Sequence, residues 1–169
     1  MEAYKKGDAK AFDEIYERYS SRLNRFIRFR LSQSHINFLD DLFQITWLKI
    51  HRARKDFNPE SKFSSWAYSI AINTIRDHFA LRRFKKELIA EDIDNISDVE
   101  PDPTWKIDFE KVRIHLNQLP AIQREVLLLS DLEGFSSIEI SQLLSLNSDA
   151  VRKIISRARK KIKESLEGL

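Results

Sequence analysis

The sequence predicts an all-α fold, and three observations carry that prediction. Apolar residues recur with a helical period through both halves of the chain. The alternating apolar and polar runs, bounded by turn residues, that indicate strands are lacking. Only three glycines occur in 169 residues, so few positions interrupt a helix. With 42% hydrophobic residues, the chain can bury a core, either as one domain or as two small ones.

The periodicity predicts helices at residues 8–30, 38–54, 63–84, 106–117, 121–131, 137–145 and 148–167. The first three form an N-terminal three-helix bundle, and the remainder form a C-terminal four-helix domain. Between Glu87 and Glu110 lie nine acidic residues, one lysine and two of the four prolines. This composition favours a solvated, mobile linker. We therefore predict domains at 1–86 and 106–169, joined by an acidic linker at 87–105.

Composition also excludes several classes of protein. The chain has no cysteine, which excludes disulfides and thiolate metal sites. The N-terminal residues lack the apolar run of a secretion signal, and no stretch is long enough to span a membrane, so we expect a cytoplasmic protein without membrane insertion. A net charge of +3 does not by itself indicate nucleic-acid binding. Its distribution is more informative, because residues 152–163 hold seven basic residues and no acidic one.

The C-terminal helices from residue 137 onward have the pattern of a helix-turn-helix. Ser136 and Glu139 have the spacing of a capping box, which predicts that a short helix begins there. A turn at residues 145–147 follows, and either Asn147 or Ser148 can cap the next helix. Two helices joined by so tight a turn are typical of this motif.

The second helix of the motif is amphipathic. Its apolar face holds Val151, Ile154, Ile155, Ala158 and Ile162. The opposite face holds Ser148, Asp149, Arg152, Lys153, Ser156, Arg159, Lys160 and Lys163. Side chains at the start of a recognition helix meet base edges in the major groove, while later cations meet phosphates. The simpler alternative is that this basic face is only solvated. Because the basic face follows a capped short helix and a tight turn, the sequence favours DNA binding.

The helix at 63–84 combines a core face with a polar arc. The predicted core face holds Ala67, Ile70, Ala71, Thr74, Ile75 and Leu81. The arc holds Ser69, Asn73, Arg76, Ala80 and Arg83, bordered by Trp66, Ile72 and Phe79. Polar groups beside flat rings, with cations on both flanks, are typical of single-strand binding. Both Trp66 and Phe79 have the alternative of a core residue, and for Trp66 this alternative is favoured.

The whole chain, from about residue 7 to 167, resembles the bacterial sigma factors of RNA polymerase, specifically their small extracytoplasmic-function group. The stretch DDLFQITWLKIHRARKDF is similar to the family's polymerase-binding helix, and FSSWAYSIAINTIRDHFALRR to its promoter-melting segment. The final helices, from LPAIQREVLLL onward, are similar to its helix-turn-helix domain. Two departures stand out: Ile45 occupies a position that is usually acidic, and Ser145 replaces a turn glycine.

The resemblance implies three sets of binding residues. The set for the polymerase core is Asp40, Asp41, Gln44 and Leu48, of which Asp41 and Gln44 match a D-x-x-Q pattern. The set for the minus-ten element is Asn58, Lys62, Phe63, Ser64, Ser65, Trp66, Asn73, Arg76, Asp77, Arg82 and Arg83. The set for the minus-thirty-five element is Ser136, Ser148, Asp149, Arg152, Lys153, Ser156, Arg157, Arg159 and Lys160. The implied partners are the core polymerase, through its clamp and flap regions, promoter DNA and an anti-sigma factor.

The resemblance implies no catalytic residue, no metal, no cofactor and no small-molecule substrate. Two other classes of function are open. A transcription regulator could share the helix-turn-helix and act without polymerase. An enzyme could use the histidines at positions 35, 51, 78 and 115, although their spacing matches no metal motif such as H-E-x-x-H.

Overall fold

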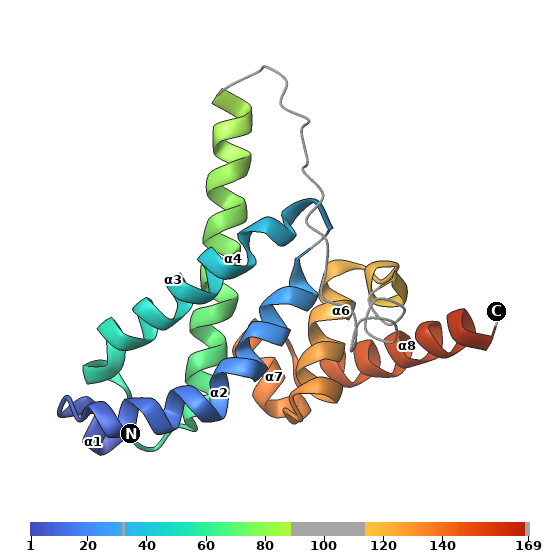
Figure 1. Cartoon of the computed structure of the whole chain (residues 1–169). Coiled ribbons are helices and arrows are strands. Elements are labelled where there is room, and N and C mark those ends of the chain that lie inside the picture. Colours follow the sequence, from blue (N-terminus) through green and yellow to red (C-terminus); the bar gives the residue numbers. More distant parts are fainter. Residues whose placement is uncertain (32, 89–113, 168–169) are drawn as a thin grey trace. The chain divides into compact units, whose positions relative to one another are not determined.

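The computed structural model describes residues 1–31, 33–88 and 114–167, and every regular element in these ranges is helical (Figure 1). The predicted all-α class is confirmed. The chain divides into two compact units, Met1–Ser97 and Asp98–Leu169. Most of the predicted linker lies outside the described residues, so its boundaries stay a prediction.

The N-terminal unit contains the three predicted helices and shorter elements before and between them. Its elements are α1 (Glu2–Lys5), α2 (Ala9–Arg30), the 3₁₀ helix η1 (Gln33–Phe38), α3 (Leu39–Arg52), the 3₁₀ helix η2 (Ala53–Asp56) and α4 (Phe63–Leu88). The side chain of Asp8 caps α2, accepting bonds from the amides of Lys10 and Ala11. The predicted helix at 63–84 continues to Leu88, and α1 was not predicted.

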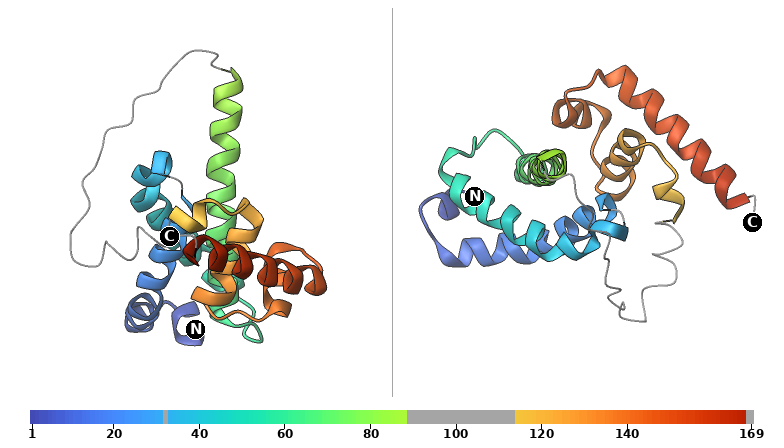
Figure 2. Two further views of the ribbon diagram at one scale, coloured as in Figure 1. Left: turned by 90° about the vertical axis from the view of Figure 1, so that its right-hand side faces the viewer. Right: turned by 90° about the horizontal axis from the view of Figure 1, so that it is seen from above.

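The core of this unit forms where α2, α3 and α4 meet. Viewed along α4, both α2 and α3 run past the same side of it (Figure 2). Ile27, Leu31, Leu42 and Ile75 make a fully buried cluster. Burying each such side chain contributes roughly 1.5–3 kcal/mol relative to exposure. The core therefore fixes the outward faces of α3 and α4.

Two predictions about α4 were wrong. Ile72, placed beside the polar arc, is 1% exposed, and Leu81, placed on the core face, is 62% exposed. Because α4 contacts both α2 and α3, its buried stripe is wider than one neighbour would require. Its C-terminal end runs past both of them (Figures 1 and 2), and we attribute the exposure of Leu81, which lies near that end, to this overhang.

The C-terminal unit is built around α8. Its elements are α6 (Ala121–Leu127), the π-helix η3 (Leu128–Leu132), α7 (Ser137–Leu144) and α8 (Ser148–Glu167). Of the helix predicted at 106–117, only the last four residues are described, and they are helical. Both α6 and α7 pack against α8 (Figure 2), burying Val126, Leu129, Ile140, Val151 and Ala158.

The helix predicted at 121–131 does not remain α-helical. After Leu127 it widens, so that the amide of Glu133 bonds to the carbonyl of Leu128 at 3.1 Å, five residues back. Gly134 then turns the chain with φ +73°, a conformation that glycine adopts without a steric penalty. The wide turn is thus followed directly by the turn that leads into α7.

Candidate functional site

The side of α3 that faces away from the core combines acidic, amide and apolar groups. We call this surface the α3 outer face and define it by Asp40, Asp41, Gln44, Ile45 and Leu48, which are all exposed. Leu48 is 54% exposed and Ile45 41%, whereas Leu42 and Ile50 on the opposite side are buried. A single exposed apolar residue needs no explanation, but Ile45 and Leu48 together, beside a row of polar residues, form a surface suited to a partner. Sequence reasoning missed Ile45, because it was considered only as a departure from the usual acidic residue.

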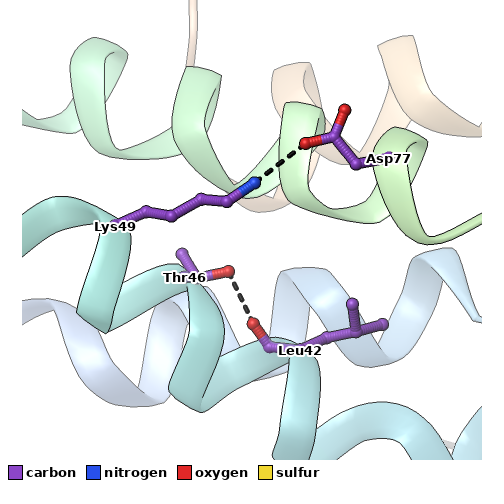
Figure 3. Close-up of polar contacts among 4 residues, drawn as sticks. All are labelled: Leu42, Thr46, Lys49 and Asp77. Atoms are coloured by element: carbon purple, nitrogen blue, oxygen red, sulfur yellow. Dashed lines mark hydrogen bonds and ion pairs between the residues drawn. The ribbon is translucent and has the colours of Figure 1, made fainter.

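A surface ion pair joins α3 to α4. Lys49 Nζ donates to Asp77 Oδ2 at 2.8 Å, with the two side chains 41% and 62% exposed (Figure 3). On the adjacent turn, the buried Thr46 hydroxyl donates to the Leu42 carbonyl at 2.7 Å, so it needs no other partner. A pair this exposed contributes about 0–1 kcal/mol. Asp77, predicted to contact the minus-ten element, is thus already engaged in linking two helices, and no sequence signal pointed to Lys49.

The loop at Asn58–Lys62, here the 58–62 loop, connects η2 to α4. The side-chain oxygen of Asn58 accepts a bond from the amide of Glu60 at 3.0 Å, and its carbonyl accepts one from the amide of Ser61 at 2.9 Å. These two bonds close a tight turn around Pro59. The side-chain NH₂ group of Asn58 takes no part in these two bonds, and both Asn58 and Lys62 are exposed.

The rings at the start of α4 pack on one another. Trp66 lies edge-on to Phe57 with ring centroids 5.2 Å apart, and Phe63 lies 5.7 Å from Trp66. Tyr19 of α2 covers Phe63 at 4.8 Å. Phe63 and Trp66 are consequently half-buried, as are Ser64 and Ser65. These predicted contact residues directly follow the 58–62 loop in the sequence, and only part of each of the two rings is exposed.

Farther along α4, the predicted polar arc is partly present. Asn73 and Arg76 are exposed on the surface of the helix. Ser69 is half-buried, and its hydroxyl donates back to the carbonyl of Trp66 at 2.7 Å. The side chains of Arg82 and Arg83 lie outside those that the structure describes. Asn73 and Arg76 are therefore the described members of the arc that can meet an external ligand.

In the C-terminal unit, α7 and α8 form the predicted helix-turn-helix, and the capping box is confirmed. The amide of Glu139 donates to the Ser136 hydroxyl at 3.3 Å, while Glu139 Oε2 accepts from the Ser136 amide at 2.9 Å and from its hydroxyl at 2.8 Å. Both protons that Ser136 can donate are thus used within the cap. A DNA phosphate could bind either proton only by displacing Glu139.

The turn between α7 and α8 is tight. Ser145 adopts the left-handed conformation with φ 54° and ψ 45°, and the next amide, of Leu146, donates to the Ser141 carbonyl at 2.9 Å. Asn147 Oδ1 then accepts from the amide of Asp149 at 2.8 Å. Of the two predicted caps for α8, Asn147 is therefore the one with a side-chain bond.

The two faces of α8 are as predicted. Val151 and Ala158 are fully buried, and Ile154, Ile155 and Ile162 are half-buried. The exposed face holds Asp149, Arg152, Lys153, Ser156, Arg157, Arg159 and Lys160, and Ser148 at the helix start is half-buried.

The cations of this face differ in what they already bind. Arg152 forms an ion pair with Asp149 on the preceding turn, and Lys160 lies 3.7 Å from Glu164. Within the described residues, Lys153 and Arg157 have no side-chain partner. Lys153 and Arg157 are thus the predicted cations that can meet a phosphate or base without first breaking a contact.

Arg159 is held by Asp131 of the π-helix. Its Nε donates to Asp131 Oδ2 at 3.1 Å and its Nη2 to Oδ1 at 2.6 Å, a bidentate pair. The Arg159 guanidinium holds the pKa of the Asp131 carboxyl below its usual range, against the opposing effect of partial burial. The pair joins elements 28 residues apart, and the sequence carried no signal for it.

The four histidines make different contacts. His51 bonds to Tyr4 and His115 to Ser165, while the rings of His35 and His78 both pack against Phe38 and Phe79. Among the described residues, no group of three acidic or histidine side chains is arranged to hold a metal ion. Within the same ranges, none of the helices combines the length and hydrophobicity needed to cross a bilayer.

Comparison with known proteins places both units in one family. The family description Sigma-70 region 2 matches residues 15–92, and Sigma-70, region 4 matches residues 115–162. The chain is 31% identical to RNA polymerase sigma factor SigZ of Bacillus subtilis, with 92% of this chain and 87% of that protein covered. It is 28% identical to the ECF RNA polymerase sigma-E factor of Haemophilus influenzae, with 100% and 94% covered.

A solved structure shares the fold. It is the sigma factor RpoE from Bartonella quintana in complex with the anti-sigma factor NepR, with a TM-score of 0.81 at 22% identity. The match covers 94% of this chain and 98% of that one.

Proposed function

The chain belongs to the extracytoplasmic-function group of the sigma-70 factors, which direct promoter-specific initiation by RNA polymerase, and we propose that each of its units reads one element of the promoter. The observation that carries the proposal is the presence in one chain of two unlike surfaces. One is the α3 outer face, suited to a protein partner, and the other is the cationic face of a capped helix-turn-helix.

The C-terminal unit reads the minus-thirty-five element as duplex. In this proposal the first turns of α8 enter the major groove, and Arg152, Lys153 and Arg157 contact bases and phosphates. The buried face of α8 supports this role, because Val151 and Ala158 anchor the helix and leave its cations outward. Arginine can bond bidentately to guanine, at roughly 1–3 kcal/mol of discrimination per good contact.

The N-terminal unit captures melted bases of the minus-ten element. The 58–62 loop holds the Asn58 amide group and Lys62 at an exposed turn, and Asn73 and Arg76 lie exposed on α4. A base that leaves the stack can bond to such amides, while the cations neutralise the backbone. Trapping it offsets the few kcal/mol needed to extrude it. The proposed melting step therefore uses binding energy alone and needs no cofactor.

The α3 outer face docks on the polymerase core. Its exposed Ile45 and Leu48 supply apolar area, and Asp41 and Gln44 supply hydrogen-bonding groups at their edge. Depleted charge at the centre with a polar rim is the usual anatomy of a protein interface. We place this contact on the polymerase clamp, with the C-terminal unit toward the flap, and the protein acts in the cytoplasm with the polymerase.

An anti-sigma factor is a further proposed partner. The solved sigma factor with the same fold is held by one. The surfaces proposed for polymerase binding are exposed in this chain, so a protein that covers them would keep it from the polymerase.

Run-off transcription from a randomised promoter library tests the proposal. Purified bacterial core polymerase is assayed with and without this protein, and the transcribed templates are sequenced. We expect initiation only with the protein, from templates that share two spaced elements. If duplex binding is intact and no initiation occurs, the chain is a polymerase-independent regulator.

The docking surface has its own test. The double substitution Asp41→Ala and Gln44→Ala should weaken binding to the core polymerase, measured by competition with the unsubstituted chain. Lys10→Ala, on the exposed side of α2, is a matched control that should bind normally. Unchanged assembly of the double variant would remove these residues from the site.

A further inference from the structure

The N-terminal turn of the chain reaches the 58–62 loop. Lys5 Nζ donates a hydrogen bond to the carbonyl oxygen of Phe57 at 2.9 Å, across 52 residues of sequence. Phe57 directly precedes Asn58, so this carbonyl belongs to the peptide that starts the loop. A bond from an ammonium group is charge-assisted and belongs to the stronger class of hydrogen bonds. The loop is therefore attached at its root to a residue outside the predicted binding sets.

Lys5 extends from a fixed turn. The neighbouring Tyr4 is 1% exposed, and its ring lies against Phe12 at 5.5 Å and His51 at 5.9 Å. Its hydroxyl is 3.0 Å from His51 Nδ1. Burial raises the pKa of Tyr4, so the phenol keeps its proton at neutral pH. These contacts hold α1 against α2 and the last turn of α3, and α1 also lies against η2. Together they restrict where the Lys5 ammonium can lie.

Phe57 links this turn to the start of α4. Its side chain is 3% exposed, and its ring meets Trp66 at 5.2 Å and Phe63 at 6.4 Å. The ring is thus held by α4 while the carbonyl is held by Lys5. With both ends fixed, the Phe57 peptide has one orientation.

The orientation of that peptide sets the direction of the loop. Beyond it, Asn58 closes the turn with two hydrogen bonds, to the amides of Glu60 and Ser61. A short turn closed in this way moves as a unit with the peptide on which it is mounted. Rotation of the Phe57 carbonyl would carry the Asn58 amide group with it.

We propose that Lys5 is a positioning residue for promoter melting, which holds the 58–62 loop in the orientation that captures a minus-ten base. This inference rests on the proposed function, and it adds a residue outside the part of the chain that meets DNA. Lys5 acts through the Phe57 carbonyl, and its loss should slow base capture while leaving polymerase docking intact.

The test compares Lys5→Met, which removes the donor, with Lys6→Met. Lys6 lies on the same turn, is exposed and has no side-chain hydrogen bond or ion pair within the described residues, so its variant loses the same charge without losing the bond. Lys5→Arg keeps a donor able to reach the carbonyl. Each protein is assembled with core polymerase on a promoter recovered from the library, with 2-aminopurine in the minus-ten element. Melting is followed by fluorescence at saturating holoenzyme, and core affinity and thermal unfolding are measured in parallel.

We expect Lys5→Met to melt the promoter at least about tenfold more slowly, as for loss of a charge-assisted bond, with core affinity unchanged. Lys6→Met should match the unsubstituted chain, and Lys5→Arg should restore most of the rate. Equal rates for the two methionine variants would overturn the inference, as would a loss of core affinity and thermal stability in step with the rate. If the unsubstituted chain melts no promoter, the proposed function fails first and the inference falls with it.

Discussion

Replacing Ser145 with glycine should stabilise the C-terminal unit. Ser145 is exposed, has no side-chain partner within the described residues, and is held at φ 54° and ψ 45°. A residue with a Cβ atom in this left-handed conformation costs about 1–2 kcal/mol, which glycine avoids. Glycine in turn gives the unfolded chain more freedom, which costs about 0.4–1 kcal/mol. The net expectation is a gain of about 0.5–1 kcal/mol in the free energy of unfolding.

The gain should appear in calorimetry of the full chain as a rise of about 2–8 °C in the transition of the C-terminal unit. Ser145→Ala, which keeps the Cβ atom, should show no gain. Ser156→Gly is the matched control, because Ser156 is exposed within α8, where glycine should lower stability by roughly 0.5–1 kcal/mol. If Ser145→Gly is no more stable than Ser145→Ala, the strain argument is refuted.

Three further predictions concern the ion pair, the cationic face and the polar arc. Because Arg159 lowers the pKa of Asp131, their pair stabilises the fold above the ordinary carboxyl pKa and is lost as pH falls through the lowered one. Asp131→Asn should therefore lower the free energy of unfolding, measured in urea, by about 0.5 kcal/mol at pH 7 and by less below about pH 4. A loss of stability that becomes larger as the pH falls would contradict this. For the binding of holoenzyme to promoter DNA, the logarithm of the binding constant falls linearly with the logarithm of the salt concentration. Lys153→Ala should reduce the size of this slope by about 0.9, and Arg159→Ala should reduce it by less than half of that. Equal reductions would show that Asp131 does not restrain Arg159. Asn73→Ala should slow promoter melting about fivefold, as for loss of a base contact of ~1 kcal/mol, while the affinity for duplex DNA stays nearly unchanged. Equal losses in melting rate and duplex affinity would contradict a role of the polar arc in binding melted bases.

Local rules were enough to predict the regular elements and the C-terminal motif. The amphipathic period located α2, α3, α4 and α8, and the Ser136 and Glu139 spacing located the start of α7. These signals depend on neighbours within one or two helical turns. The binding sets predicted from the resemblance remain predictions, but the structure places the outer α3 residues and the α8 cations on exposed faces.

What the sequence did not predict depends on contacts between distant segments. The bonds of Lys5 to Phe57 and of Arg159 to Asp131 join residues 52 and 28 positions apart, and no period relates them. Ile72 is buried because a second helix packs on α4, and Leu81 is exposed because that packing ends before it. Burial of this kind depends on which helices meet, and a single helical wheel cannot show it.

The π-helix at Leu128–Leu132 is a place where this unit can lose a residue. Its bonds reach back five residues, so it holds one residue more than an α-helical turn there would. Deleting Ser130 would let the helix continue in regular α-helical form, with bonds that reach back four residues. Asp131 would then still face Arg159, and the turn at Gly134 would keep its direction. A deletion within the regular helix α8 would instead rotate each later residue by about 100° around the axis. We therefore expect deletion of Ser130 to be tolerated far better than a single-residue deletion within α8.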